Sequence, residues 1–477
     1  MGLRRDFLAG KLLRVRLIKV EVQADISQNG HPVSGDAVEA CLNQCVADAV
    51  EGSFDEYPKH LRPLLRLKGE RINEDSIPKD HYTRVRFSFG LPDELFPIDA
   101  GGLQLLINLL AGDMFPAEVS GCTWSNVRVL SVELPPDIWS HAYEYFRDRR
   151  AYSIDELRAL FALPDDRPLL AFSLKPRVGL TYQEVREMTL DVLKAGFNLV
   201  ELDARNLALR SAPLNDWVEL GIEAAQVGSH RTAFSPNFSV PPPQLLEITQ
   251  EWTSKIAEYG PPVIKVDGGL DGLSSIQALR TSFAGSPKPV VTCYPILRSQ
   301  LSSAIGDATW VDFLGLSGVD IIYPGGRPAF PNERRPVWAV HAEGWSKAAR
   351  AYDKMLKRGW PMPTIAGGIH PGHLHACYEL LGPLVAYFLG GAVALHPKSP
   401  KAGAELCVRV LQAAIELATQ AQEAGDVHAD DIPARLLREV ENTYYPKTVL
   451  NYYSPANVFA PMQTKTFVPQ TFYRRSL

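Results

Sequence analysis

The sequence has few cysteines, and those it has are not spaced for a metal site or a redox pair. The six cysteines contain no CxxC motif: Cys41, Cys45, Cys122, Cys293, Cys377 and Cys407. Such a sparse set is typical of reduced thiols and argues against a disulfide framework. We therefore expect a cytoplasmic protein in which most cysteines serve as small core residues.

The sequence also lacks a long apolar run and a basic stretch. No apolar run reaches the roughly 18 to 20 residues that a membrane span requires. An arginine pair near the start resembles an export signal, but Lys11, Arg14 and Arg16 interrupt the apolar segment that should follow. With a formal net charge of -5 and no Lys/Arg run, the chain predicts neither a membrane partner nor a nucleic-acid partner.

What the sequence does have is the composition of a globular protein with two or more domains. Its 477 residues are 46% hydrophobic and 22% charged, which is enough for a large core. Residues 12–25 and 82–92 alternate as strands, and residues 35–52 have helical spacing. This mixture, with a βαββαβ-like count, predicts a ferredoxin-like α+β domain over residues 1–150.

From about residue 168 to residue 425, short apolar strands alternate with amphipathic helices. The strand candidates are residues 169–176, 198–204, 232–238, 262–269, 289–296, 319–326, 363–370 and 386–393. Eight such units form a (β/α)₈ TIM barrel, whose active site lies at the carboxyl ends of its strands. We expect this barrel over residues 151–427. An aromatic-rich tail over residues 428–477, with one short helix, should pack on the barrel or on a partner subunit.

Charged residues stand at the ends of the first two barrel strands. Because side chains alternate faces along a strand, Glu201 and Asp203 share one face with Leu199. The same rule places Lys175 and Arg177 on one face at the end of the first strand. Two cations beside two acids at this end of a barrel favour a functional site over a structural network of ion pairs.

Paired glycines stand at the ends of the last two strands. Gly367 and Gly368 end the seventh strand, and Gly390 and Gly391 end the eighth, at the two loops where such barrels commonly hold phosphate. Glycine lets backbone N–H groups approach an anion, and the next helix adds its dipole. We therefore predict phosphate binding in preference to simple turn geometry.

Histidines cluster after the seventh strand. His370, at the strand end, is placed to face the predicted site. His373 and His375 fall on the next helix and would diverge from each other. We therefore do not expect a three-histidine metal site.

Four segments, SLKPRVGL, GFNLVELDARN, PTIAGGIHPGHLHA and FLGGAVALHP, together resemble the barrel of RuBisCO. The corresponding RuBisCO segments have a KPK-type first strand, a GGIH seventh strand and a GGG-type eighth strand. The likeness covers nearly the whole chain, because that family also has an α+β domain ahead of its barrel. It implies a homodimer or a higher oligomer of dimers. In the family the first domain donates a Glu and an Asn to the neighbouring subunit's site, which suggests Glu51 and Asp113 here, with surface or capping acids as the alternative.

The second strand departs from RuBisCO at the metal site. The family holds magnesium there on a carbamylated lysine, an Asp and a Glu, and these places fall on Glu201, Asp203 and Ala204. The resemblance is therefore to the RuBisCO-like proteins, which keep the fold without the carboxylase. Magnesium remains the one candidate cofactor, because it often takes only one or two carboxylates. A glutamate is shorter than a carbamylated lysine, however, so the ion would have to shift or be absent.

The family's far-phosphate positions also differ in this chain. The fifth-strand His-Arg pair falls on Tyr294 and Pro295, and the sixth-strand histidine falls on Tyr323. Arg327 and Arg334, in the following loop, offer a partial replacement. The resemblance therefore implies a substrate with a single phosphate.

RuBisCO-like enzymes with known roles mostly enolise a phosphorylated ketose or a related carbonyl compound, which implies an isomerase or tautomerase here. Glu201 or Asp203 would be the base. Lys175 and Arg177 would stabilise the oxyanion, with Lys175 the better proton donor because arginine stays protonated. One alternative is a decarboxylase or aldolase-like lyase acting through the same enolate, with Arg177 binding a carboxylate. The other is a non-catalytic ligand-binding or regulatory protein whose tyrosines fill the pocket.

Overall fold

The structure is a computed structural model of the chain. It describes residues 17–33, 35–40, 77–78, 81–93, 96, 102–108, 110, 118–119, 121–148, 151–203, 208–229, 231–269, 271–283, 287–294, 305, 307–324, 351–424 and 439. These residues form two compact units, one within Met1–Tyr145 and Arg298–Leu316 and the other within Phe146–Leu297 and Ser317–Leu477. The domain limits predicted at residues 150 and 427 remain predictions. Apart from Glu439, the predicted tail lies outside the described residues.

The N-terminal unit contains an antiparallel sheet in the order β3-β4-β1-β6-β5, with β2 beside β1. Its strands are β1 (Leu17–Gln28), β2 (His31–Pro32), β3 (Ile77–Pro78), β4 (Thr83–Pro92), β5 (Glu118–Val119) and β6 (Cys122–Glu133), with helix α3 (Gly102–Asn108) between β4 and β5 in the sequence. Central strand β1 alternates as the sequence predicts, since Ile18, Val20 and Val22 are fully buried. The predicted α+β domain is confirmed.

The C-terminal unit is a barrel of eight parallel strands in the order β10-β11-β12-β13-β14-β7-β8-β9. The strands are β7 (Leu169–Ser173), β8 (Leu199–Glu201), β9 (Ala233–Ser235), β10 (Val263–Asp267), β11 (Val290–Tyr294), β12 (Ile321–Ile322), β13 (Met362–Ile365) and β14 (Ala386–Leu389). An isolated bridge between Asn237 and Lys265 brings β9 against β10, so the ring is nearly closed. All eight strands lie at the predicted segments, which confirms the barrel.

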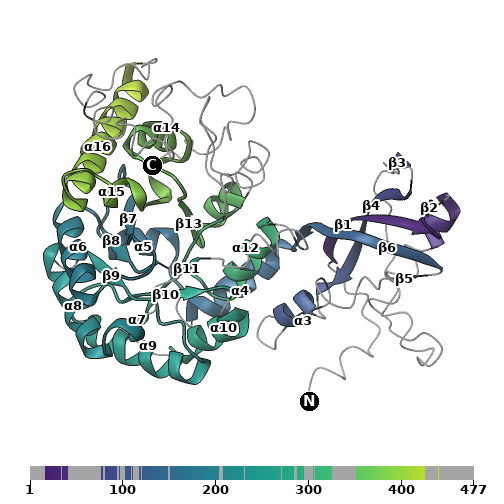
Figure 1. Cartoon of the computed structure of the whole chain (residues 1–477), viewed down its shortest axis with the longest axis horizontal. Helices are drawn as coiled ribbons and strands as arrows, with labels where there is room; N and C mark the ends of the chain where they lie inside the picture. Colours follow the sequence, from purple (N-terminus) through teal and green to yellow (C-terminus); the bar gives the residue numbers. More distant parts are fainter. Residues whose placement is uncertain are drawn as a thin grey trace. The chain divides into compact units, whose positions relative to one another are not determined.

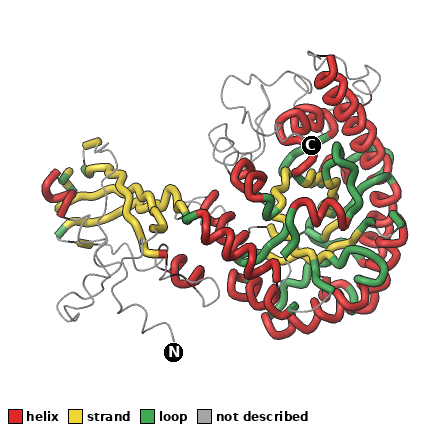
Figure 2. Tube along the Cα trace, turned by 180° about the vertical axis from the view of Figure 1, so that it is seen from behind, coloured by secondary structure: helices red, strands yellow, loops and turns green. Residues whose placement is uncertain are grey.

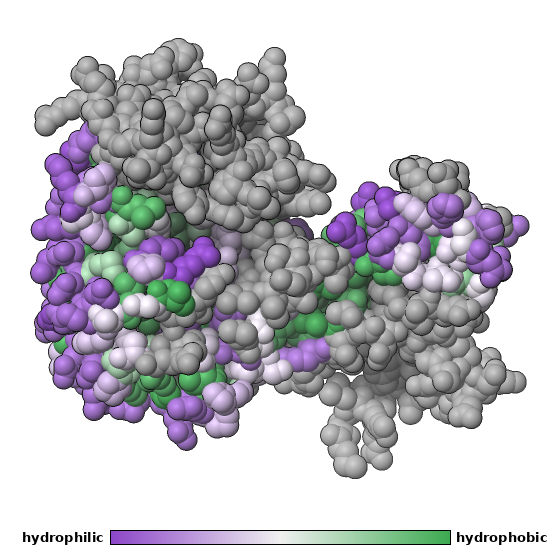
Figure 3. All heavy atoms as spheres, in the orientation of Figure 1, coloured by the Kyte–Doolittle hydropathy of each residue, from purple (hydrophilic) through white to green (hydrophobic). Residues whose placement is uncertain are grey.

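Amphipathic helices cover the outside of this barrel (Figures 1 and 2). They include α6 (Tyr182–Lys194), α8 (Leu214–Val227), α9 (Pro242–Ile256), α10 (Gly272–Ser282), α14 (Pro371–Leu381) and α16 (Pro400–Ala424). The short helix α5 (Ile154–Leu160), which precedes β7, lies inside the ring of these helices in Figure 1. Helix α6 begins with a capping box, in which Thr181 accepts from the backbone N–H of Glu184 and the Glu184 carboxylate accepts from that of Thr181. On the face drawn in Figure 3, hydrophilic residues predominate along the outer helices of the barrel.

One helix between two barrel strands groups with the other unit. Helix α12 (Asp307–Leu316) lies between β11 and β12 in the sequence, yet Arg298–Leu316 belongs to the N-terminal unit. The sequence pattern gives no sign of this, because residues 309–316 of the helix are buried on every side and have no single apolar face. Among the described residues, no helix has both the length and the apolar character that crossing a membrane requires.

Candidate functional site

The outward faces of the barrel strands are apolar, and this fixes which residues point inward. Phe234 of β9 stacks on Trp217 of α8, with ring centroids 5.6 Å apart, so Phe234 points outward. Its neighbour Ser235 therefore points inward, because side chains alternate along a strand. Ser235 is the register partner of Glu201 on β8, and paired residues of parallel strands point to the same side. Glu201 therefore faces the barrel interior.

Lys175 and Asp203 lie just beyond the ends of β7 and β8. The backbone pairing continues past the strands, since Leu174 N donates to Glu201 O at 3.0 Å. This extension carries Lys175 and Asp203 forward side by side. Lys175 Nζ donates to Asp203 Oδ2 at 2.6 Å, and the two side chains are 22% and 10% exposed. One of the two predicted cations thus lies against one of the two predicted acids at the barrel mouth.

Arg177 lies on the solvent side of this pair. Its Nε is 3.7 Å from Asp203 Oδ2, and its side chain is 53% exposed. Burial lowers the pKa of Lys175 below its usual value; the attraction of Asp203 opposes this shift, and the nearby charges of Arg177 and Lys265 reinforce it. A lysine ammonium with a lowered pKa releases its proton more readily, as a proton donor at neutral pH must.

Glu201 pairs with a residue that the sequence analysis missed, Lys265 of β10. Lys265 Nζ donates to Glu201 Oε1, and the side chains are only 4% and 7% exposed. The signal was present in the sequence, since Lys265 interrupts the apolar strand VIKVD two positions before Asp267. The two-residue rule used for the first two strands places Lys265 and Asp267 on one face.

Tyrosines occupy the neighbouring part of the barrel mouth. The rings of Tyr294, at the end of β11, and Tyr323, just after β12, stack with centroids 5.8 Å apart and planes 6° apart. Tyr323 Oη donates to Ala366 O at 3.4 Å. Lys265 Nζ lies 5.9 Å from the centroid of the Tyr294 ring. The tyrosines therefore border the ionic cluster as an aromatic wall, and Tyr294 is 38% exposed.

The predicted glycines allow close approaches at the same end of the barrel. Gly367 and Gly368 have φ values of 87° and 74°, which side chains rarely adopt. A Cβ on Gly390 would lie 3.2 Å from Lys175 Cε, so a glycine here lets the end of β14 lie against the lysine. Gly391 begins α15 (Gly391–Ala394), a helix of four residues. Phosphate binding at these loops remains a prediction.

His370 caps a helix. Its Nδ1 accepts the backbone N–H of Gly372 at 3.1 Å at the start of α14, and the residue is 2% exposed. The His370 and His373 rings lie 3.6 Å apart between centroids. The N-cap position uses one ring nitrogen of His370 to satisfy an otherwise unpaired donor of the helix.

Further acids lie where β9 and β10 end. Asp271 Oδ2 accepts from Asp267 N at 2.6 Å and from Ser239 Oγ at 3.0 Å. Burial raises the pKa of Asp271, although these hydrogen bonds oppose the shift. Asp267 Oδ1 accepts from Gly269 N at 3.0 Å. These bonds fix the loops that follow the two strands.

The acids do not fit the magnesium ion that the RuBisCO resemblance implies. Lys175 holds Asp203, and Lys265 holds Glu201, in ion pairs. Among the residues that the structure describes, no three His, Cys, Asp or Glu side chains are grouped so that they could hold a metal. A hard cation needs carboxylate oxygens that are not already paired with ammonium groups. Four further predicted residues lie outside the described residues: Glu51, Asp113, Arg327 and Arg334.

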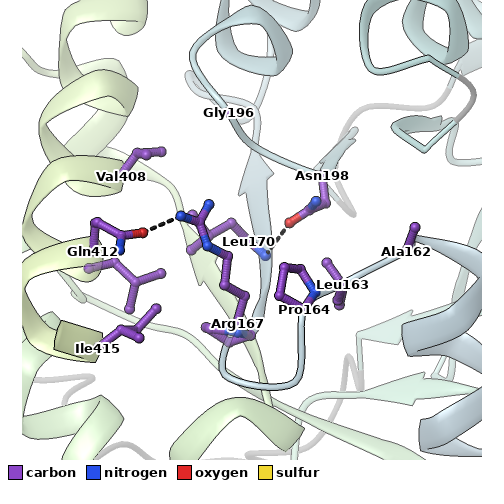
Figure 4. Close-up of a pocket in the computed structure, with 12 residues that line it drawn as sticks. Ala162, Leu163, Pro164, Arg167, Leu170, Gly196, Asn198, Val408, Gln412 and Ile415 are labelled. Carbon is purple, nitrogen blue, oxygen red and sulfur yellow. Dashed lines mark hydrogen bonds between the residues drawn. The ribbon is translucent and has the colours of Figure 1, made fainter. Parts of the chain in front are cut away.

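A cavity of about 100 Å³ lies at the opposite ends of the first two barrel strands. Its lining includes Leu170 at the start of β7 and Asn198 just before β8. In Figure 4, Arg167 crosses it toward Gln412 of α16, to which it donates, while Asn198 Oδ1 accepts from Leu170 N at 3.0 Å. In a TIM barrel this end serves stability, and active sites lie at the other.

Comparisons with known proteins agree with this architecture. The chain is 22% identical over 422 residues to the ribulose bisphosphate carboxylase of Methanocaldococcus jannaschii, which covers 83% of this chain and 93% of the relative. No family model matches.

Solved structures give the same result. The octameric RuBisCO of Pyrococcus horikoshii, crystallised with sulfate, has a TM-score of 0.67 at 20% identity and covers 89% of this chain and 93% of its own. A rubisco-like protein from Alicyclobacillus acidocaldarius has a TM-score of 0.67 at 17% identity, covering 90% and 99%. At such identities the structural likeness shows a shared fold.

Proposed function

We propose that the chain, which is similar to the ribulose bisphosphate carboxylases in sequence and to a rubisco-like protein in fold, is an enolising isomerase or tautomerase. Its proposed substrate is a small, singly phosphorylated carbonyl compound. It is proposed not to be a carboxylase. Glu201 occupies the position at which the resemblance places the carbamylated lysine, and it is paired with Lys265. The family's third ligand position falls on Ala204.

The observation that carries the proposal is the Lys175–Asp203 pair. A proton donor and a proton acceptor lie 2.6 Å apart at the carboxyl ends of β7 and β8, partly exposed above a buried interior. Enolisation needs a base beside the α-carbon and a proton donor beside the carbonyl oxygen. This pair supplies both groups within the reach of one small substrate.

The proposed steps keep every proton accounted for. The Asp203 carboxylate removes the α-proton, and the electrons of the C–H bond move to the carbonyl oxygen. Lys175 donates a proton to that oxygen, with Arg177 beside it as a fixed positive charge. Asp203 then returns its proton to a different carbon, and the hydroxyl group whose oxygen becomes the new carbonyl gives its proton to Lys175. Both side chains thereby regain their starting protonation states. We assign the base to Asp203 because it lies beyond the end of β8 beside Lys175, the proposed proton donor. Glu201 lies within the strand and is paired with the buried Lys265.

The proposed substrate class rests on the aromatic wall that borders the charges. Tyr294 and Tyr323 stand where the resemblance places far-phosphate ligands, and their stacked rings offer no positive charge. Gly367 adjoins this wall, because a Cβ there would lie 3.3 Å from Tyr323 Oη, and Gly390 adjoins Lys175. The proposed single phosphate binds at these glycine loops. An octameric relative supports an oligomer of dimers here.

Solvent deuterium exchange tests the proposal. A panel of sugar phosphates and related carbonyl compounds is incubated with the protein in D₂O, and loss of the α-proton signal is followed by NMR. Wild-type protein should exchange at least one compound, and Lys175→Met should lose the activity. The matched control is Lys255→Met, which removes an exposed lysine paired with Glu251 on α9. Wild-type exchange rates in Lys175→Met would remove the assignment.

A lyase is the second candidate, and the exposure of Arg177 favours it. A half-exposed guanidinium at the mouth is placed to bind a substrate carboxylate by two parallel hydrogen bonds. A decarboxylase would release carbon dioxide, and an aldolase-like enzyme would release an aldehyde. A non-catalytic binding protein would show thermal stabilisation by a ligand with no exchange.

A further inference from the structure

Lys265 lies within barrel strand β10, whose sequence VIKVD is apolar except for this lysine and the final Asp267. Lys265 is the third residue of β10, between Ile264 and Val266, which are fully buried. Its own exposed fraction is 3%, so its ammonium group is out of bulk water. A buried charge is costly unless another charge and hydrogen bonds compensate for it.

The compensating charge is Glu201, two strands away on β8. Lys265 Nζ donates to Glu201 Oε1. On another side the ammonium lies 5.9 Å from the centroid of the Tyr294 ring, whose face attracts cations. The carboxylate and the ring hold the ammonium in place beside the acid. Lys265 is thus fixed at the border between the ionic and the aromatic parts of the mouth.

A divalent cation and this ammonium would compete for the same oxygen atoms. Magnesium binds carboxylate oxygens at about 2.0–2.1 Å in a near-octahedral arrangement. Lys265 already donates to Glu201 Oε1, and Lys175 donates to Asp203 Oδ2. An ion placed between the two acids would lie against two ammonium groups of the same charge. The two lysines therefore already occupy carboxylate oxygens that a metal ion would need as ligands.

We propose that Lys265 is a built-in cation that takes the place of a metal ion in this barrel. Its ammonium holds Glu201 in position and provides a positive charge beside that acid, so the site binds no divalent cation and works without one. Lys265 is a positioning residue, because it is too deeply buried to touch the substrate directly. The statement about metal binding is independent of the proposed function, and the statement about the reaction rests on it.

Direct titration with Mn²⁺ tests the metal statement without any substrate. The full-length protein is titrated with Mn²⁺ alone, and free Mn²⁺ is followed by its electron paramagnetic resonance signal. Wild-type protein should show no saturable binding up to about 10 mM. Lys265→Ala removes the competing ammonium and opens space beside two acids, so it should bind Mn²⁺ at least about tenfold more tightly than wild type. Lys265→Arg, which keeps the charge, should behave as wild type.

A control variant shows whether Mn²⁺ binding gained by Lys265→Ala uses the Glu201 carboxylate. Lys265→Ala combined with Glu201→Gln should lose the Mn²⁺ binding again. Saturable binding by wild-type protein that Glu201→Gln abolishes would overturn the proposal, and so would a folded Lys265→Ala variant that gains none. The wild-type titration decides the matter even if Lys265→Ala does not fold.

The exchange assay tests the statement about the reaction. Wild-type deuterium exchange should be unchanged by EDTA. Lys265→Met should lower it at least about tenfold, with Lys265→Arg restoring most of the loss. Exchange that occurs only with added Mg²⁺ would contradict this inference while leaving the proposed function intact. If no compound exchanges at all, the proposed function fails while the Mn²⁺ result stands by itself.

Discussion

The barrel mouth has two differently built parts. Strands β7, β8 and β10 present lysines and acids in two ion pairs, Lys175–Asp203 and Lys265–Glu201. Strands β11 and β12 present a stacked pair of tyrosines. The ionic part can move protons and stabilise developing charge, whereas the aromatic part offers surface and exclusion of water. The contrast indicates that chemistry and substrate shape are handled by different strands, so substitutions in the two parts should have different effects.

The largest effect is expected from the pair at the rim. Asp203→Asn keeps the size of the side chain but cannot accept the α-proton, so the deuterium exchange rate should fall by about 10²- to 10⁴-fold. Glu251→Gln, which breaks an exposed pair with Lys255 on α9, is the control. Exchange by Asp203→Asn within about twofold of wild type would show that the base lies elsewhere.

The buried pair should affect stability more than any exposed pair. Lys265→Met leaves the Glu201 carboxylate buried without its partner, which should lower the free energy of unfolding by about 3–5 kcal/mol in urea denaturation. Adding Glu201→Leu should recover much of this loss, because both charges are then absent. Lys357→Met, which breaks an exposed pair with Asp353, should cost no more than about 0.5 kcal/mol. An equally small loss for Lys265→Met would contradict the buried pairing.

The pH dependence should report on Lys175. Burial lowers the pKa of Lys175, so Lys175 should lose its donor proton at a lower pH than an ordinary lysine does. The exchange rate should therefore fall as the pH rises through the lowered pKa. Between the lowered pKa and the ordinary one, the unfolded chain binds more protons than the folded chain. Stability should therefore rise with pH across that interval.

The variant Lys175→Met shows whether Lys175 or another titrating group causes the rise in stability with pH. Lys175→Met should remove the rise in stability, which can be followed by urea denaturation at several pH values. The same rise in Lys175→Met as in wild type would assign it to another group.

The smallest effect is expected in the aromatic part. Tyr323→Phe keeps the stack on Tyr294 and loses the long hydrogen bond to Ala366 O, which should cost about 0.5–1.5 kcal/mol of stability. The KM for the exchanged compound should change only through the shape of the pocket, so the exchange rate at saturating substrate should stay near that of wild type. A loss of that rate as large as in Asp203→Asn would end the distinction between the two parts.

The sequence predicts the barrel well because each strand is a short apolar segment followed by a polar residue, glycine or proline. It also predicts that Lys175 and Asp203 meet, since both follow adjacent strands and need only the two-residue rule. The Lys265–Glu201 pair is different. It joins strands that are not neighbours, and it depends on closure of the ring at β9 and β10. The position of α12 in the N-terminal unit likewise depends on packing that no local pattern contains.

Deuterium entry from D₂O into a panel of phosphorylated carbonyl compounds, measured by NMR with EDTA present throughout, tests the metal-free enolisation most directly. Wild-type protein should exchange at least one compound without a divalent cation, and Lys175→Met should exchange none. Exchange that requires added magnesium, or that proceeds at the wild-type rate without Lys175, would disprove metal-free enolisation by Lys175.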